Sequence, residues 1–125
     1  MAEPKIDSPP LRIGLDGSKA QAQSLGEIRD QMFPLTRQLI QIALQRYDLT
    51  QDAVFFKSNP DEVEAIEQQE RNLEAALEYA RKLRPAGEGF HHVVEAMMRA
   101  TISTSVTEQL IAFEGTILLD SDASS

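Results

Sequence analysis

The stretch NPDEVEAIEQQERNLEAALEYARKLRPAG, residues 59–87, contains the clearest helix signals in the chain. Asn59 is a strong helix N-cap, and Pro60 suits the first helical position. Basic residues gather in the last predicted turn, and Pro85-Ala86-Gly87 predicts the end of the helix. Between these ends, a and d heptad spacing is kept by Val63, Ile66, Glu70, Leu73, Leu77, Ala80 and Arg84.

This heptad spacing predicts coiled-coil packing of the helix beside another long helix. Glu70 occupies a position where a leucine would pack. We therefore expect Glu70 to set the register of the pair or the choice of partner.

A first helix is predicted from about residue 25 to residue 47. Ser24 and Glu27 form a capping box at its start. Its apolar residues follow at steps of three and four, and they are Leu25, Ile28, Met32, Leu35, Leu39 and Ile42. Pro34 lies inside this run, so we expect a bend near Met32-Phe33.

Residues 48–52 interrupt this periodicity and predict a connecting loop. The loop continues as Ala53-Val54-Phe55-Phe56, which is strongly apolar. Two adjacent phenylalanines are expected to tuck over the end of the helical bundle, because large apolar side chains are usually buried.

A third helix is predicted from Phe90 to about Phe113. One apolar face runs through it, formed by Val94, Met98, Ile102, Val106, Leu110, Phe113 and Ile117. Hydroxyl and β-branched residues at 101–107 lower its helix propensity. We favour one long helix with a weak middle, although a capping box at Ser105 and Glu108 also allows two shorter helices.

The two ends of the chain differ in composition from this helical part. Residues 1–23 are rich in proline and glycine and predict a flexible arm, in which residues 11–15 suit a short strand or a docking peptide. Residues 120–125 are polar and predict a disordered tail. We therefore predict an arm at 1–23, a single helical domain at 24–119 and a tail at 120–125.

The predicted fold class is all-α, with three long helices after a disordered N-terminal arm. Both a bent three-helix bundle and an elongated helical hairpin fit the pattern. Three long helices leave part of an apolar face open, so the sequence favours a homodimer.

Composition limits the function. The chain has 125 residues and a formal net charge of −8, so it has room for one domain and opposes the phosphates of nucleic acid. It contains no cysteine, which excludes disulfides, thiolate metal sites and cysteine nucleophiles. We expect no direct nucleic-acid partner.

We also expect a cytoplasmic protein without a membrane span. The first residues lack the basic and apolar regions of a secretion signal, and no stretch approaches the ~18 apolar residues of a spanning helix. A chain without cysteine fits a reducing compartment.

Negative charge concentrates between residues 48 and 78, which contain nine acidic and two basic residues. Such a face can steer a basic partner or act as a decoy that occupies a nucleic-acid-binding protein. The alternative is a solvated face, partly balanced by the pairs Glu67–Arg71 and Glu78–Lys82.

The histidines suggest one further chemistry. His91 and Glu95 are four residues apart on one helical face, His92 is three residues from Glu95, and Glu88 lies nearby. These residues are candidates for a metal or phosphate site, although their spacing matches neither the Glu-x-x-His of carboxylate-bridged bundles nor the His-Glu-x-x-His of metalloproteases. The alternative is an ordinary histidine pair at the start of a helix. We assign no catalytic, cofactor-binding or metal-ligating residue and expect no cofactor.

Met97 and Met98, with Phe90 and Phe113, are candidates for a soft groove that accepts a partner helix. Burial in the bundle core is the alternative. In addition, the run His91-x-Val93-x-x-Ala96-Met97-x-x-Ala100 resembles part of the C-terminal helical signature of flagellar hook-basal-body junction proteins. After this run, Ile111-Ala112-Phe113-Glu114-Gly115 replaces the basic and amide residues of that signature, and residues 59–87 do not match, so we assign no family.

The sequence shows no phosphate-binding glycine loop and no nucleophile motif, so we do not expect an enzyme. It favours a non-enzymatic protein that binds another protein, such as an adaptor, an assembly chaperone or a structural component. Binding would use the apolar helix faces, and the acidic second helix would steer the approach. The alternatives are the metal- or phosphate-handling bundle and the acidic decoy.

Overall fold

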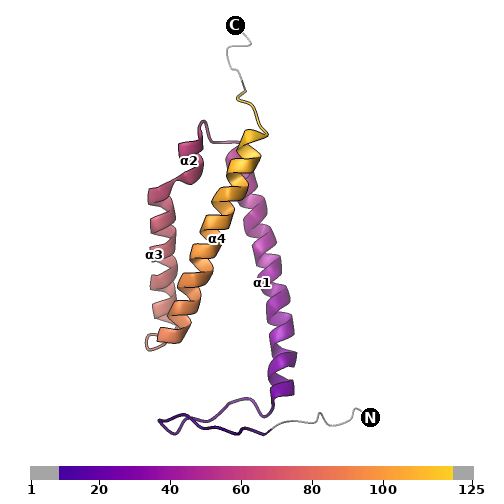
Figure 1. The fold of residues 1–125 in the computed structure, drawn as a ribbon, viewed down its shortest axis with the longest axis vertical. Coiled ribbons are helices and arrows are strands. Elements are labelled where there is room, and N and C mark those ends of the chain that lie inside the picture. The colour runs from indigo at the N-terminus through magenta and orange to yellow at the C-terminus, as the bar shows by residue number, and fades with distance from the viewer. Residues whose placement is uncertain (1–8, 120–125) are drawn as a thin grey trace, which may run out of the picture. The chain divides into compact units, whose positions relative to one another are not determined.

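The computed structural model describes residues 9–119, and its regular elements in this range are all helices (Figure 1). No strand occurs between residues 9 and 119. In chain order the helices are α1 (Leu25–Val54), α2 (Pro60–Glu64), α3 (Ile66–Leu83) and α4 (Glu88–Glu114). The prediction of an all-α chain with three long helices is confirmed, and α2 is a short additional helix.

The chain divides into two compact units, residues 1–45 and residues 46–125. The described part of the first unit contains the segment 9–24 and most of α1. The second unit contains the last turns of α1 together with α2, α3 and α4. The predicted arm, domain and tail boundaries stay a prediction, and the tail at 120–125 lies outside the described residues.

The segment before α1 contains a tight turn at residues 14–18. The N–H of Gly14 donates to the carbonyl of Ser18 at 2.8 Å, and the Ser18 N–H donates to Oδ1 of Asp16 at 3.0 Å. Gly17 has a φ of +87°, a region that L side chains rarely adopt. Residues 11–15 form no strand, and Leu11 and Leu15 are exposed. The docking-peptide alternative stays a prediction.

Both residues of the predicted capping box bind the backbone at the start of α1, although the Glu27 carboxylate reaches Gln23 and not Ser24. Oγ of Ser24 accepts a hydrogen bond from the Glu27 N–H at 3.0 Å, and the Glu27 carboxylate accepts one from the Gln23 N–H at 2.7 Å. These bonds satisfy backbone donors that have no partner within the helix. α1 then continues through Pro34 as one helix, although proline removes one of its backbone hydrogen bonds.

The predicted end of α1 at residue 47 is wrong, because the helix continues to Val54. Residues 48–54 contain neither glycine nor proline, so nothing in them stops the helical hydrogen bonds. The Thr50 hydroxyl also donates to the Tyr47 carbonyl at 2.9 Å, which satisfies that polar group inside the helix. The apolar spacing is interrupted by Arg46 and resumes at Leu49, so the interruption does not mark the end of the helix.

The predicted burial of Phe55 and Phe56 is also wrong, since these side chains are 72% and 87% exposed. They form the turn after α1, where their N–H groups donate to the carbonyls of Asp52 and Ala53. Val54, the last residue of this longer helix, is buried instead of the two phenylalanines and is 2% exposed.

The predicted second helix begins as expected and is then interrupted. Oδ1 of Asn59 accepts a hydrogen bond from the Glu62 N–H at 3.0 Å, which confirms the cap. The interruption lies at Ala65, which adopts the left-handed conformation with φ 40° and ψ 55° and separates α2 from α3. The side chain of Gln69 donates to the Glu64 carbonyl exposed by this break. Val63 in α2 is nevertheless buried, because α2 contacts α4.

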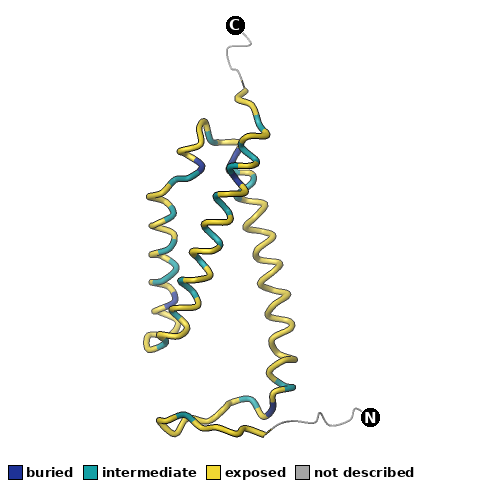
Figure 2. The backbone as a smooth tube through the Cα atoms, viewed as in Figure 1, coloured by how far each residue is buried: buried dark blue, intermediate teal, exposed yellow. Residues whose placement is uncertain are grey.

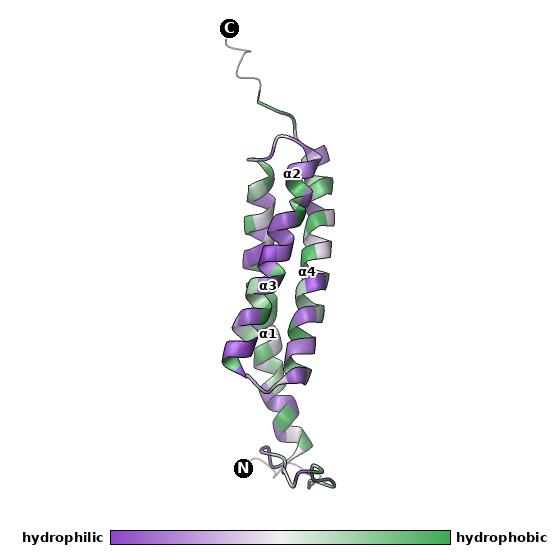
Figure 3. Ribbon diagram, turned by 90° about the vertical axis from the view of Figure 1, so that its left-hand side faces the viewer, coloured by the Kyte–Doolittle hydropathy of each residue, from purple (hydrophilic) through white to green (hydrophobic). Residues whose placement is uncertain are grey.

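α3 and α4 form an antiparallel hairpin around a short connection at residues 84–87 (Figure 1). Ala80 of α3 is 1% exposed, and its small side chain allows close packing of the two helices. Hydrophilic and hydrophobic residues alternate along both helices, as amphipathic packing requires (Figure 3). The heptad prediction holds from Leu73 to Ala80, whereas Ile66 is 62% exposed beside the break.

α4 is one continuous helix, as predicted. Residues 101–107 have low helix propensity but stay helical, and the hydroxyls of Thr101 and Thr107 donate to the carbonyls of Met97 and Ser103. Five of its predicted apolar residues from Val94 to Leu110 are half-buried, whereas Ile117 lies beyond the helix and is exposed. Burial in residues 9–119 is sparse (Figure 2), and the buried apolar side chains are Val54, Val63 and Ala80.

Replacing Ala65 with glycine is expected to raise the free energy of unfolding by up to about 1 kcal/mol. A left-handed L residue costs roughly 1–2 kcal/mol, and the greater chain entropy of glycine offsets about half of the gain. Urea denaturation followed by circular dichroism measures the difference. Ala75→Gly, at an exposed position inside α3, is the control and should destabilise by about 1 kcal/mol. Equal destabilisation by the two changes would contradict the left-handed conformation at Ala65.

Glu62 is expected to titrate below the ordinary pKa of glutamate. Its carboxylate accepts hydrogen bonds from the N–H and the hydroxyl of Ser58, at 2.7 and 2.8 Å, and these bonds lower its pKa, with a smaller contribution from Lys57. Because the folded-state pKa lies below the unfolded one, the interaction stabilises the fold at neutral pH and is lost as the pH falls through the folded-state value.

A carbon NMR titration of the Glu62 carboxyl measures this pKa. Ser58→Ala removes the hydroxyl donor and should raise the midpoint of the titration, while the backbone donor remains. An ordinary midpoint that does not respond to Ser58→Ala would contradict the described hydrogen bonds.

Candidate protein-interaction site

α1 exposes a row of large apolar side chains over most of its length. We call this row the α1 stripe, and it consists of Leu25, Ile28, Met32, Leu35, Leu39, Ile42 and Leu49, with the charged Arg46 at one position between the last two. Its first six residues are between 43% and 57% exposed, and Leu49 is 69% exposed. The spacing of three and four residues brings the members to one face of the helix. This face is an unburied apolar surface of the kind that marks interaction sites.

A second apolar row lies on another side of α1. It contains Phe33, Ile40 and Tyr47 at seven-residue spacing and ends at Val54. The Arg37 guanidinium lies 5.3 Å from the centre of the Phe33 ring, so a cation–π contact covers part of this row. Val54 itself is buried. Apart from Val54, the residues of the second row are as exposed as the α1 stripe, with Phe33 at 64%, Ile40 at 63% and Tyr47 at 49%.

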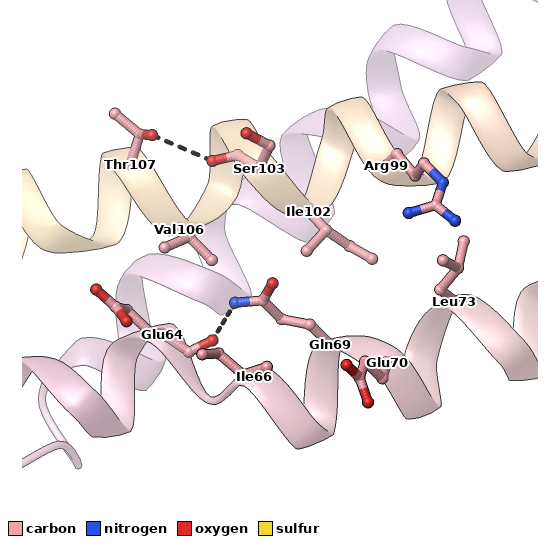
Figure 4. A pocket seen from close by; sticks show the side chains of 10 residues that line it. All are labelled: Glu64, Ile66, Gln69, Glu70, Leu73, Arg99, Ile102, Ser103, Val106 and Thr107. Atoms are coloured by element: carbon pink, nitrogen blue, oxygen red, sulfur yellow. Dashed lines mark hydrogen bonds between the residues drawn. The ribbon is translucent and has the colours of Figure 1, made fainter.

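A groove of about 420 Å³ runs between α3 and α4 (Figure 4). Its apolar part is formed by Ile66 and Leu73 of α3 and by Ile102 and Val106 of α4. Polar side chains also line the groove, and they are Glu64, Gln69, Glu70, Arg99, Ser103 and Thr107. The groove is thus a mixed surface rather than an apolar pocket.

Several polar side chains of this groove form hydrogen bonds or ion pairs with residues four or five positions away in the sequence. Gln69 donates to the Glu64 carbonyl, and the Thr107 hydroxyl donates to the Ser103 carbonyl at 3.1 Å. Arg99 forms an ion pair with Glu95 at 3.1 Å. No histidine lines the groove, and its carboxylates are those of Glu64 and Glu70. These interactions fix the polar side chains that line the groove.

Glu70, the predicted polar residue of the heptad stripe, lines this groove and is exposed. Glu67, Glu74 and Glu78 of α3 are exposed as well. The predicted balancing pairs are absent from the described residues, because Arg71 donates to Gln68 at 3.1 Å and Lys82 forms no ion pair with Glu78. The four glutamates of α3 are therefore exposed and form no ion pair within residues 9–119, although the helix also carries three basic residues.

The structure places the histidines in different roles. Nε2 of His91 lies 2.7 Å from the carbonyl oxygen of Arg84, and since a carbonyl only accepts, the histidine Nε2–H must donate. This bond joins the start of α4 to the end of α3. His92 is exposed, and Glu95 pairs with Arg99. Within residues 9–119, no group of three His, Cys, Asp or Glu residues is arranged to hold a metal ion.

The predicted groove of methionines and phenylalanines is not formed. Phe90 and Phe113 lie near opposite ends of α4, about 34 Å apart along the helix axis, which is too far for one groove. Met98 is half-buried in the hairpin, while Met97 is 42% exposed. The groove that exists uses other residues of α4, between Arg99 and Thr107.

Sequence reasoning missed the length of the α1 stripe and the position of the groove. Continuing the same steps beyond Arg46 reaches Leu49, which is a signal that the predicted helix end concealed. The groove depends on the break at Ala65 and on how α3 and α4 face each other, and no sequence pattern specifies either.

None of the helices described between residues 9 and 119 is both long and apolar enough to cross a membrane. No protein-family model, no curated protein and no solved structure matches the chain.

Replacing His91 with alanine is expected to lower the free energy of unfolding by about 1 kcal/mol, because it removes the hydrogen bond to the Arg84 carbonyl. His92→Ala is the control, and at an exposed position it should change the free energy by less than about 0.5 kcal/mol. Urea denaturation measures both variants. Equal effects would contradict a structural role specific to His91.

Proposed function

We propose that this chain is a non-enzymatic protein-interaction component that binds another protein through apolar helix faces. Its general class is that of an adaptor, an assembly chaperone or a structural component. The observation that supports the proposal is the α1 stripe, whose leucine, isoleucine and methionine side chains remain about half exposed from Leu25 to Ile42.

The free energy available at this surface is substantial. Full burial of one large aliphatic side chain stabilises by roughly 1.5–3 kcal/mol, and the half-exposed members of the α1 stripe retain about half of that each. The pattern of anchors at steps of three and four suits a partner that is itself an amphipathic helix. Exposed apolar surface of this extent is uncommon on soluble monomers, which favours an occupied surface in the cell.

The exposed glutamates of α3 contribute to the second part of the proposal. Glu67, Glu70, Glu74 and Glu78 lie exposed on α3 without an ion pair among the described residues, and they outnumber the three basic residues of that helix. We propose that this charge favours partners with basic surfaces and accelerates their encounter. A chain without cysteine is suited to the reducing cytoplasm, which we propose as the place of this interaction.

A charge placed in the α1 stripe is expected to abolish partner binding. In Leu39→Glu, a carboxylate replaces an exposed seam residue, and binding of an apolar helix would then have to bury that charge. The matched control is Gln41→Glu, which adds the same charge to α1 outside the stripe. Tagged wild type and both variants are recovered from the native cell lysate and compared by quantitative mass spectrometry.

The expected result is a partner recovered in stoichiometric amount with wild type and Gln41→Glu, and reduced at least tenfold with Leu39→Glu. Circular dichroism verifies that both variants keep the helix content of the wild type. Recovery of the same proteins in the same amounts with Leu39→Glu would refute the proposed role of the α1 stripe.

A further inference from the structure

We propose that Ala65 is a conformational switch at which α2 and α3 join into one continuous helix over residues 60–83. The proposal goes beyond the proposed function, since it concerns the α2–α3–α4 part of the chain and not the α1 stripe. It follows from the backbone conformation of Ala65, from two side chains that bind the backbone at the break, and from the burial of Val63.

The residue types around the break favour a continuous helix. Residues 61–83 contain neither glycine nor proline, and alanine has the highest helix propensity of all residues. Ala65 nevertheless has a φ of 40°, in the left-handed region that L residues other than asparagine and aspartate rarely adopt. Contacts elsewhere in the fold therefore hold this conformation against the local preference.

Two side chains bind backbone carbonyls at the break. In a continuous helix, the carbonyls of Glu62 and Glu64 accept hydrogen bonds from the N–H groups four residues later. In the described structure, the Glu62 carbonyl accepts a hydrogen bond from Nζ of Lys57 at 2.8 Å, and the Glu64 carbonyl accepts one from the side-chain amide of Gln69. These side-chain donors stabilise the broken form, and backbone N–H groups replace them in the continuous form.

Val63 provides the apolar contact that holds α2 in the broken form. Its side chain is 3% exposed, and α2 contacts α4. Ile66, three residues further along, is 62% exposed. Residues three apart lie on one face of a continuous helix, so joining α2 to α3 changes the burial of these two side chains. The broken form thus depends on one buried valine and two side-chain hydrogen bonds, which offset the disfavoured conformation of Ala65.

The groove between α3 and α4 depends on this switch. Glu64 precedes Ala65 and Ile66 follows it, and both line the groove together with Gln69 (Figure 4). Joining the two helices turns Glu64 relative to Ile66 and releases the Gln69 amide from the Glu64 carbonyl. The shape and the polar lining of the groove therefore differ between the two forms, and a ligand of the groove would shift the population toward the form that it binds better.

The experiment measures the distance between two spin labels by double electron–electron resonance. The chain has no cysteine, so Asp61→Cys in α2 and Glu78→Cys in α3 provide the two attachment sites, and both positions are exposed. These positions lie about 26 Å apart along the axis of a continuous helix and closer together when the helix is bent at Ala65. The ratio of the long to the short distance therefore reports the ratio of the continuous to the broken form.

The labelled chain is expected to show the short distance as its main population. Combining Lys57→Ala with Gln69→Ala removes both side-chain donors, and it should raise the ratio about twentyfold, because each lost hydrogen bond changes it about fivefold. Ala65→Gly relieves the left-handed residue and weakens the continuous helix, so it should lower the ratio at least tenfold, on the order of the glycine effects in both forms.

Gln68→Ala is the matched control, since the Gln68 amide bonds to Asn72 within α3 and not to the break, and it should leave the ratio within a factor of about two. Circular dichroism verifies that each variant keeps its helices. If the combined variant does not fold, Gln69→Ala alone decides the question, with an expected rise of about fivefold. Absence of the long distance from the variant without these donors, or an equal effect of Gln68→Ala, would overturn the proposal.

Discussion

The packing of α3 against α4 is the interaction on which the described structure of residues 46–119 depends. Ala80 lets the two helices approach closely, and the His91 side chain joins the start of α4 to the Arg84 carbonyl at the end of α3. α2 adds Val63 to the same side of the hairpin. Because a pair of helices can bury only the faces that meet, this packing leaves the α3–α4 groove and the acidic face of α3 open to solvent.

The α1 stripe, unlike the facing sides of α3 and α4, is left exposed. An isolated helix gains little from its backbone hydrogen bonds alone, and most of its stability in proteins comes from burying an apolar face. α1 has a satisfied N-terminal capping box and two apolar rows, yet along the α1 stripe its large side chains remain about half exposed. In the proposed function, the apolar surface that α1 leaves exposed along this stripe is the surface available for association with a partner.

Much of the local structure could be predicted from residue types. Ser24, Glu27 and Asn59 bind the backbone donors that their positions indicated, because capping depends on a few neighbouring residues only. The candidate site was less predictable. The stripe up to Ile42 follows from spacing, but Leu49 was hidden by the wrong helix end, and Glu95, considered for a metal site, is paired with Arg99.

The sequence by itself determined the helical class, the helix starts and the apolar stripe of α1, since each follows from chemistry repeated within a few residues. Only the tertiary structure decided that Ala65 breaks the second helix and that Phe55 and Phe56 stay exposed while Val54 is buried. These outcomes depend on which side chains are buried when segments distant in the sequence pack together. Local propensity does not determine that packing.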